Sequence, residues 1–192
     1  MEPVDDSRIR CSDPSSFLPL GIAPIRLHLV KTVLLVCTAN ICRSPMAAAI
    51  MRQRIAALGL SDQVEVLSAG MWARNGQPAS EDAITVLAAR GLSLADHRSQ
   101  PLTPELLDRT DIVLVMEEAH RRSIFYLAPK HLHKVMLLTE LIGGYDDIDD
   151  PYGGPIEGYV NTEAQLETLI DAGLRRLLWQ LGFAPPTANS AA

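Results

Sequence analysis

The apolar positions of this chain fall into four short runs that are rich in β-branched residues. Strands that are covered on both faces of a sheet show such runs, because neither face meets water. The pattern therefore predicts strands over Thr32–Val36, Val64–Leu67, Ile112–Val115 and Val135–Leu138.

Helix end signals lie between these runs. Pro45 fits the first position of a helix that Gly59 closes. Ser80 can cap a second helix, and Arg90 with Gly91 can end it.

Three more helices are expected later in the chain. Thr103 followed by Pro104 starts a short helix, and residues 117–127 form a further candidate. Thr162 and Gln165 form a capping-box pattern, and leucines at helical spacing follow it. Strands that alternate with helices predict an α/β fold with a small open parallel sheet of about four strands, flanked by helices. In such a sheet, the site lies beyond the carboxyl end of the first strand.

Composition sets the domain boundaries and excludes some partners. The 192 residues suffice for one domain, which we place over residues 31–183. Residues 1–30 hold several prolines and form an N-terminal extension, which is either partly disordered or an extra capping segment. Residues 184–192 form a C-terminal tail. The net charge of −6 argues against nucleic acid or a membrane surface as a partner.

The N-terminus and the cysteines indicate the compartment. The first residues are acidic and lack the order of a signal peptide, so a cytoplasmic location is expected. Three cysteines are too few for a disulfide framework, and no Cys/His cluster suggests a metal. We therefore expect no metal and no other cofactor.

The segment from Cys37 to Pro45, Cys-Thr-Ala-Asn-Ile-Cys-Arg-Ser-Pro, joins the first predicted strand to the first predicted helix. A tight loop before a helix presents backbone N–H groups and the positive end of the helix dipole to an anion. The same field favours the thiolate form of a cysteine held there, which makes it a nucleophile. Arg43 offers a guanidinium that can bind two phosphate oxygens at once.

This loop resembles the phosphate-binding loop of the low-molecular-weight protein tyrosine phosphatases, and the resemblance spans roughly residues 31–182. Asp149-Asp150-Pro151 also matches the family, in which an Asp-Pro pair late in the chain supplies the general acid. The resemblance implies that Cys37 is the nucleophile, that Arg43 binds phosphate and that Asp150 is the acid, with Asp149 as the alternative. Ser44 either helps the thiolate leave or only caps the helix.

The resemblance also implies roles for the remaining loop and its neighbours. Backbone amides of the loop bind phosphate, and Asn40 adopts a left-handed backbone braced by Ser68 and His97. Trp72 and Tyr152 form walls for an aromatic ring, although Trp72 is equally compatible with ordinary packing, and His97 with a simple structural role. The loop residues concerned are Thr38, Ala39, Asn40, Ile41, Cys42 and Arg43. Cys42 lies close enough in sequence to trap an oxidised Cys37 as a disulfide.

One loop position departs from the family pattern, since Ala39 stands where Gly is usual. Its methyl group predicts a small change of geometry that affects the rate more than the activity. Arsenate reductases of the same fold need two further cysteines downstream, and this chain has none after Cys42.

Two alternatives to a tyrosine phosphatase remain open. Protein arginine phosphatases carry Thr where this chain has Ile41, and a non-catalytic phosphate-binding module would keep the fold without turnover. The sequence therefore predicts a phosphatase whose substrate is a phosphotyrosine-containing protein and whose product is inorganic phosphate. Bacterial relatives oppose tyrosine kinases that control exopolysaccharide export, which suggests such a kinase as one partner.

Overall fold

The sheet consists of four parallel strands in the order β2-β1-β3-β4. The computed structural model describes residues 30–183. The strands are β1 (Lys31–Cys37), β2 (Val64–Gly70), β3 (Ile112–Val115) and β4 (Val135–Leu137). The predicted open parallel sheet is therefore confirmed, and β2 extends three residues beyond its predicted end.

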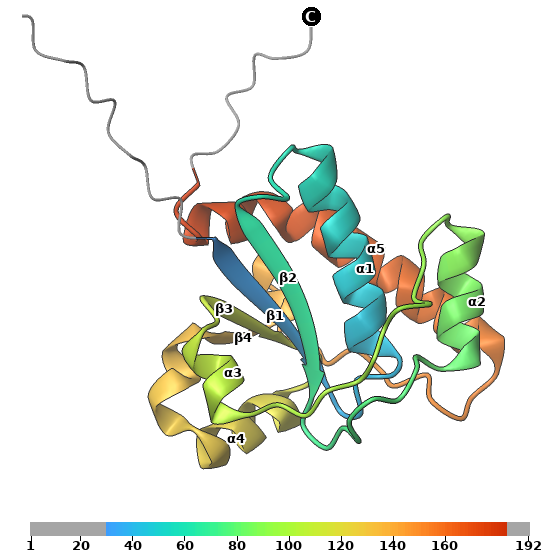
Figure 1. The fold of residues 1–192 in the computed structure, drawn as a ribbon, viewed down its shortest axis with the longest axis horizontal. Helices are drawn as coiled ribbons and strands as arrows, with labels where there is room; N and C mark the ends of the chain where they lie inside the picture. Colours follow the sequence, from blue (N-terminus) through green and yellow to red (C-terminus); the bar gives the residue numbers. More distant parts are fainter. Residues whose placement is uncertain (1–29, 184–192) are drawn as a thin grey trace, which may run out of the picture.

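Helices cover both faces of this sheet (Figure 1). One face packs against α1 (Arg43–Ala57), α2 (Glu81–Ala89) and α5 (Ile156–Gln180), and the other against α3 (Pro104–Asp108) and α4 (Glu118–Leu127). Two short 3-10 helices, η2 (Pro129–Lys134) and η3 (Leu138–Ile142), flank β4 and have no counterpart in the sequence prediction.

The position of β1 between two helical layers explains why its sequence does not alternate between apolar and polar residues. Val33 and Leu35 belong to the core beneath α1 and α5, whereas Leu34 and Val36 belong to the core beneath α3 and α4. All four side chains are fully buried. Because successive side chains of a strand point to opposite faces, a strand between two helical layers needs apolar residues at every position.

Several predicted helix ends are confirmed. The Ser80 side chain accepts a hydrogen bond from the Ala83 amide at the start of α2, and Thr103 caps α3 in the same way. Gly59 and Gly91 follow the ends of α1 and α2 with φ angles of 69° and 73°. This left-handed backbone is where glycine is favoured after a helix.

Two predicted helix starts are wrong. Helix α5 begins at Ile156, six positions before the capping-box pattern at Thr162, whose hydroxyl donates to the Gly158 carbonyl inside the helix. A buried threonine can make this bond in mid-helix, so the pattern alone does not mark a start. Helix α1 begins at Arg43, two positions before the predicted start at Pro45. Proline is tolerated there, because the N–H groups of the first turn of a helix make no hydrogen bond within the helix.

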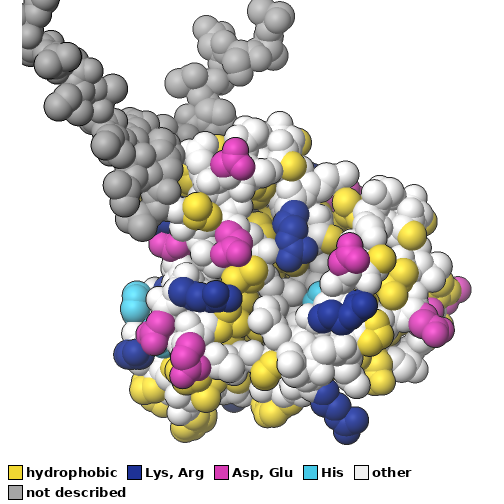
Figure 2. Space-filling view, viewed as in Figure 1, with side chains coloured by type: hydrophobic (Ala, Val, Ile, Leu, Met, Phe, Trp, Pro, Cys, Tyr) yellow, Lys and Arg dark blue, Asp and Glu magenta, His cyan; other side chains and the backbone are white. Residues whose placement is uncertain are grey.

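The predicted domain boundaries stay a prediction. The predicted N-terminal extension, residues 1–30, lies outside the described residues except for Val30, and the predicted C-terminal tail, residues 184–192, lies wholly outside them. None of the helices between residues 30 and 183 combines the length and apolar character needed to cross a membrane. Figure 2 shows lysine and arginine side chains interspersed with aspartate and glutamate over one face.

Candidate active site

The loop from Cys37 to Arg43 connects the carboxyl end of central strand β1 to the first turn of α1. Asn40 has a φ angle of 56°, which is the left-handed backbone expected from the sequence. It is the sole residue other than glycine with a positive φ between residues 30 and 183. Such a backbone persists only where surrounding contacts hold it, because it is unfavourable for a side chain larger than glycine's.

Those contacts come from four residues in three segments of the chain. The Asn40 side-chain amide donates to the hydroxyls of Ser44 and Ser68 at 2.9 Å each, and its oxygen accepts from the Gln100 amide at 2.9 Å. The His97 ring nitrogen Nε2 lies 2.7 Å from the Asn40 carbonyl oxygen. The structure thus brings Ser68 and His97 to Asn40, and it adds Gln100, which the sequence did not indicate.

Gly70 is the point where β2 passes the loop most closely. A Cβ atom added there would lie 2.8 Å from the carbonyl carbon of Ala39 and from the amide nitrogen of Asn40. Real Cβ atoms do not approach backbone atoms so closely, so only glycine fits. The loop is further tied to the chain after β2 by hydrogen bonds from Met71 to Cys37 and from Trp72 to Thr38.

The Cys37 sulfur receives hydrogen bonds within this loop. Its Sγ lies 3.0 Å from the Ser44 hydroxyl, and the Asn40 amide donates to it at 3.3 Å. The residue is only 3% exposed, yet it lines a pocket. These two hydrogen bonds fix the position of the sulfur at the pocket.

Arg43 is almost completely buried, with 1% of its surface exposed, and its guanidinium is held by four groups of the protein. Nη2 donates to the Thr38 hydroxyl at 3.0 Å and to Asp150 at 2.6 Å. Nη1 donates to the Ile148 carbonyl at 2.7 Å and to the carboxylate of Glu117. Within the described chain, Nε is buried without a hydrogen-bond partner.

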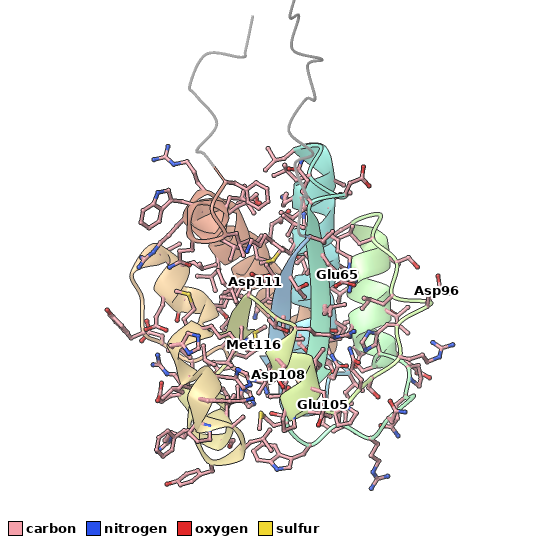
Figure 3. The ribbon with its side chains drawn as sticks, turned by 60° about the vertical axis from the view of Figure 1, so that its left-hand side comes forward. Glu65, Asp96, Glu105, Asp108, Asp111 and Met116 are labelled. Atoms are coloured by element: carbon pink, nitrogen blue, oxygen red, sulfur yellow. The ribbon has the colours of Figure 1, made fainter. Side chains whose placement is uncertain are left out.

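The segment that carries Asp150 is attached to the end of β3. The Met116 amide donates to the Val36 carbonyl of β1, and its carbonyl accepts from the Ile148 amide at 2.9 Å. Figure 3 labels Asp111 and Met116, which lie at opposite ends of β3. This anchoring places Asp150 against Arg43, whereas neighbouring Asp149 makes no such contact.

A pocket of about 460 Å³ opens above the loop. Trp72 and Tyr152 stand at it with exposed fractions of 63% and 66%, as walls rather than as core residues. Its lining comprises Cys37, Thr38, Ala39, Ile41, Cys42, Trp72, Arg74, Gln77, Asp150 and Tyr152. Most residues predicted for the site therefore meet here, whereas Arg74 and Gln77 were not anticipated.

Cys42 occupies the far end of the loop, in contact with other elements. Its sulfur lies 3.2 Å from the Ser80 hydroxyl and 3.6 Å from the Tyr159 hydroxyl. Burial raises the pKa of the Cys42 thiol, although these hydroxyls oppose the effect. Cys37 and Cys42 both carry free thiols.

Sequence reasoning missed two residues beside Arg43. Glu117 supplies a carboxylate to the buried guanidinium, and His120 lies 3.1 Å from the Thr38 hydroxyl through Nε2. The sequence position of Glu117 could have indicated it, because this residue lies just after strand β3, at the edge where parallel α/β sheets place their sites. His120 is one helical turn further along the chain.

Residues 32–181 match the family described as low molecular weight phosphotyrosine protein phosphatase. The chain belongs to this family. The members named low molecular weight protein-tyrosine-phosphatases are phosphoric monoester hydrolases. The resemblance drawn from the loop and from Asp150-Pro151 is confirmed at the level of the family.

Individual relatives carry two different activities in their names. A probable low molecular weight protein-tyrosine-phosphatase, EpsP of Ralstonia solanacearum, is 38% identical over 149 residues, which cover 78% of this chain and 97% of that protein. A protein-arginine-phosphatase of Geobacillus stearothermophilus is 43% identical over 72% of this chain and 90% of that protein.

The fold agrees with a solved relative. The crystal structure of a low molecular weight protein tyrosine phosphatase from T. tengcongensis superimposes with a TM-score of 0.72 at 40% identity. The match covers 76% of this chain and 99% of that one.

Proposed function

We propose that this protein is a protein tyrosine phosphatase that hydrolyses phosphotyrosine through a phosphocysteine on Cys37. The observation that carries the proposal is that Cys37 and Asp150 line one pocket, and that the buried Arg43 guanidinium donates a hydrogen bond to Asp150 at 2.6 Å. A nucleophile, a phosphate-binding cation and an acid are the three groups that this chemistry needs.

In the first step, the Cys37 thiolate attacks phosphorus and the bond to the tyrosine oxygen breaks. Asp150 gives its proton to that oxygen, so neutral tyrosine leaves. In the second step, Asp150 takes a proton from water, which attacks the phosphocysteine and releases inorganic phosphate. The Ser44 hydroxyl, 3.0 Å from the sulfur, stabilises the departing thiolate.

In the proposed mechanism, Arg43 binds phosphate through one edge of its guanidinium. Nε and Nη2 lie on the same side of the guanidinium and can bind two phosphate oxygens together. Nε lacks a partner within the described residues, whereas one hydrogen of Nη2 is held by Asp150. A phosphoryl group that binds this edge displaces Asp150 from Nη2 and releases its carboxyl group towards the leaving oxygen.

The residue at position 41 favours tyrosine over arginine. Ile41 lines the pocket, and its branched apolar side chain suits an aromatic ring better than a polar guanidinium. Trp72 and Tyr152 add aromatic walls at the pocket mouth. Arginine phosphatase activity is the second candidate, because the 43%-identical relative carries that name.

The proposed substrate is a phosphotyrosine-containing protein, such as a tyrosine kinase, in the cytoplasm. The free thiols of Cys37 and Cys42 fit a reducing compartment. Arg43, the loop amides and the start of α1 supply the positive potential that a metal ion would otherwise provide. We therefore expect full activity in the presence of a chelator.

Steady-state hydrolysis with chelator present tests this proposal. The substrates are an aryl phosphate, a phosphotyrosine peptide and a phosphoarginine peptide, and wild type is compared with Cys37→Ser, Asp150→Ala and Asp149→Ala. We expect turnover of the aryl and tyrosine substrates, its abolition in Cys37→Ser and a loss of at least about a hundredfold in kcat for Asp150→Ala.

Other outcomes would redirect the assignment. Preference for phosphoarginine would establish the second candidate function. A large loss in Asp149→Ala with little loss in Asp150→Ala would move the acid by one residue. Phosphate binding without turnover of any substrate would show a binding module.

A further inference from the structure

His120 is a buried imidazole beside the phosphate loop to which the proposed chemistry assigns no task. It lies in the first turn of α4, is 1% exposed, and its Nε2 is 3.1 Å from the Thr38 hydroxyl. The same hydroxyl accepts a hydrogen bond from Arg43 Nη2 at 3.0 Å. Thr38 therefore links a neutralised cation, a histidine and the pocket that it lines.

The charge state of this histidine follows from its surroundings. Burial lowers the pKa of His120 below its usual range, and Arg43 lowers it further, while Glu117, Asp150 and Asp147 oppose the shift. The ring is therefore neutral near neutral pH and carries one proton. Which nitrogen holds that proton decides how Thr38 is oriented.

Two observations place the proton on Nε2. Nδ1 is buried and has no partner among the described residues, and a lone pair is left unpaired there at less cost than an N–H group. Nε2 also lies 3.8 Å from the Glu117 carboxylate, which favours a hydrogen at that position. His120 then donates to Thr38.

The hydrogen of the Thr38 hydroxyl follows by exclusion. A threonine hydroxyl has two acceptor lone pairs and one hydrogen. Arg43 and His120 occupy the two lone pairs, so the hydrogen is available to an acceptor in the pocket. The acceptor that the proposed function brings there is a phosphoryl oxygen.

We propose that the Thr38 hydroxyl donates a hydrogen bond to the phosphoryl group of the substrate and that His120 is the positioning residue that aims it. This inference rests on the proposed function for the presence of a phosphoryl group in the pocket. It adds one side-chain donor to the backbone amides of the loop and gives a task to a histidine at the base of the site.

Binding of inorganic phosphate to the full-length protein tests the inference independently of turnover. Isothermal titration calorimetry compares wild type with Thr38→Val, which keeps the shape, and with Thr38→Ser, which keeps the hydroxyl. We expect the dissociation constant to rise about ten- to a hundredfold in Thr38→Val, the effect of losing a hydrogen bond to a charged group. Thr38→Ser should stay within about threefold.

The role of His120 is tested by coupling to Thr38. Leucine at position 120 cannot donate, whereas glutamine can place an amide N–H near the position of Nε2. We expect His120→Leu to weaken phosphate binding when Thr38 is present and to add almost nothing in the Thr38→Val background. His120→Gln should restore binding to within about threefold of wild type.

Each contrary result has a defined meaning. Unchanged phosphate affinity in Thr38→Val overturns the inference, and so do equal losses from His120→Leu in both backgrounds, which would indicate a purely structural histidine. If His120→Leu fails to fold, the inference is still tested by Thr38→Val, Thr38→Ser and His120→Gln. Loss of phosphate binding in folded His120→Gln contradicts the role of His120 as a donor. Phosphate binding without aryl phosphate turnover refutes the proposed function alone, and no binding by wild type refutes both.

Discussion

Arg43 sets the electrostatics of the site, because its charge is removed from water and must be met by protein groups. Its partners are two carboxylates, one hydroxyl and one carbonyl oxygen. The carboxylate of Asp150 is half exposed at the pocket, whereas that of Glu117 is more enclosed. In the proposed mechanism, Glu117 is the permanent counter-charge and Asp150 is the one that the substrate displaces.

Replacement of Glu117 by Gln should lower the free energy of unfolding. The guanidinium would keep a neutral acceptor in place of a charged one, and we expect a loss of about 1–3 kcal/mol, in the range for hydrogen bonds to charged groups. Glu118→Gln is the matched control, since its ion pair with Arg121 lies at the surface and contributes only about 0–1 kcal/mol. Urea denaturation measures both, and equal effects would contradict the distinction.

The two histidines near the site, His97 and His120, differ in whether the sequence indicated them. His97 matched a family position and contacts Asn40 as that match implied, whereas His120 had no motif to mark it. Its contact with Thr38 joins positions 82 residues apart, which no local pattern encodes. A disulfide between Cys37 and Cys42 on oxidation stays a prediction, to be read by mass spectrometry after mild peroxide.

At the scale of elements, the packing of α5 depends on where its glycines lie. Gly173 faces η3, and a Cβ added there would lie 2.5 Å from the Leu141 Cβ. Gly158 lies near the start of the same helix, where a Cβ would meet only the Pro151 Cβ at an ordinary 3.7 Å. A larger side chain therefore does not fit at position 173 but has room at position 158.

Alanine substitutions at these two positions should shift stability in opposite directions. We expect Gly173→Ala to cost about 1–3 kcal/mol through overpacking against Leu141. Gly158→Ala should gain about 0.5–1 kcal/mol, because alanine favours the helix and loses less backbone freedom on folding. Thermal unfolding compares the two variants, and destabilisation by both would show that the space at Gly158 is not free.

The elements differ in how well the sequence defined them. The four strands and the starts of α2 and α3 carried local signals, in apolar runs and in Ser80 and Thr103. Helix α5 did not, because Thr162 reproduces a start signal inside a helix. The 3-10 helices around β4 are short and are held by tertiary contacts, such as that between Leu141 and α5.

At the scale of the molecule, the sheet, both helical layers and the pocket all lie between residues 30 and 183. The family match covers nearly the same stretch, residues 32–181. The site requires the end of β1, the start of α1, the chain after β2 and the segment before α5 at once. Its assembly therefore depends on the whole sheet rather than on any one motif.

We expect the fragment 31–183 to fold and to keep the activity of the full chain. Its melting temperature should lie within a few degrees of that of the full-length protein, and kcat/KM on an aryl phosphate should agree within about twofold, since the described core and pocket are complete in it. Thermal unfolding and steady-state kinetics of the two proteins check this. A loss of activity or stability would show that residues 1–30 or 184–192 contribute to the domain.

The sequence by itself determined the class of fold and the family to which the phosphate loop belongs. Strand burial and helix caps act over a few residues, and Cys37 and Arg43 lie six positions apart on one strand-loop-helix unit, so local pattern suffices for both. The family resemblance then pointed to Asp150, which we propose as the acid.

Only the tertiary structure decided how Arg43 is satisfied and which groups surround it. Glu117, Ile148 and Asp150 reach the guanidinium from 74 to 107 residues away, and Gly70 fits against Ala39 only because β2 runs beside β1. A buried charge without a partner, or two atoms that overlap, raises the free energy of the folded protein. Both effects exist only once the chain is packed. No stretch of sequence records it.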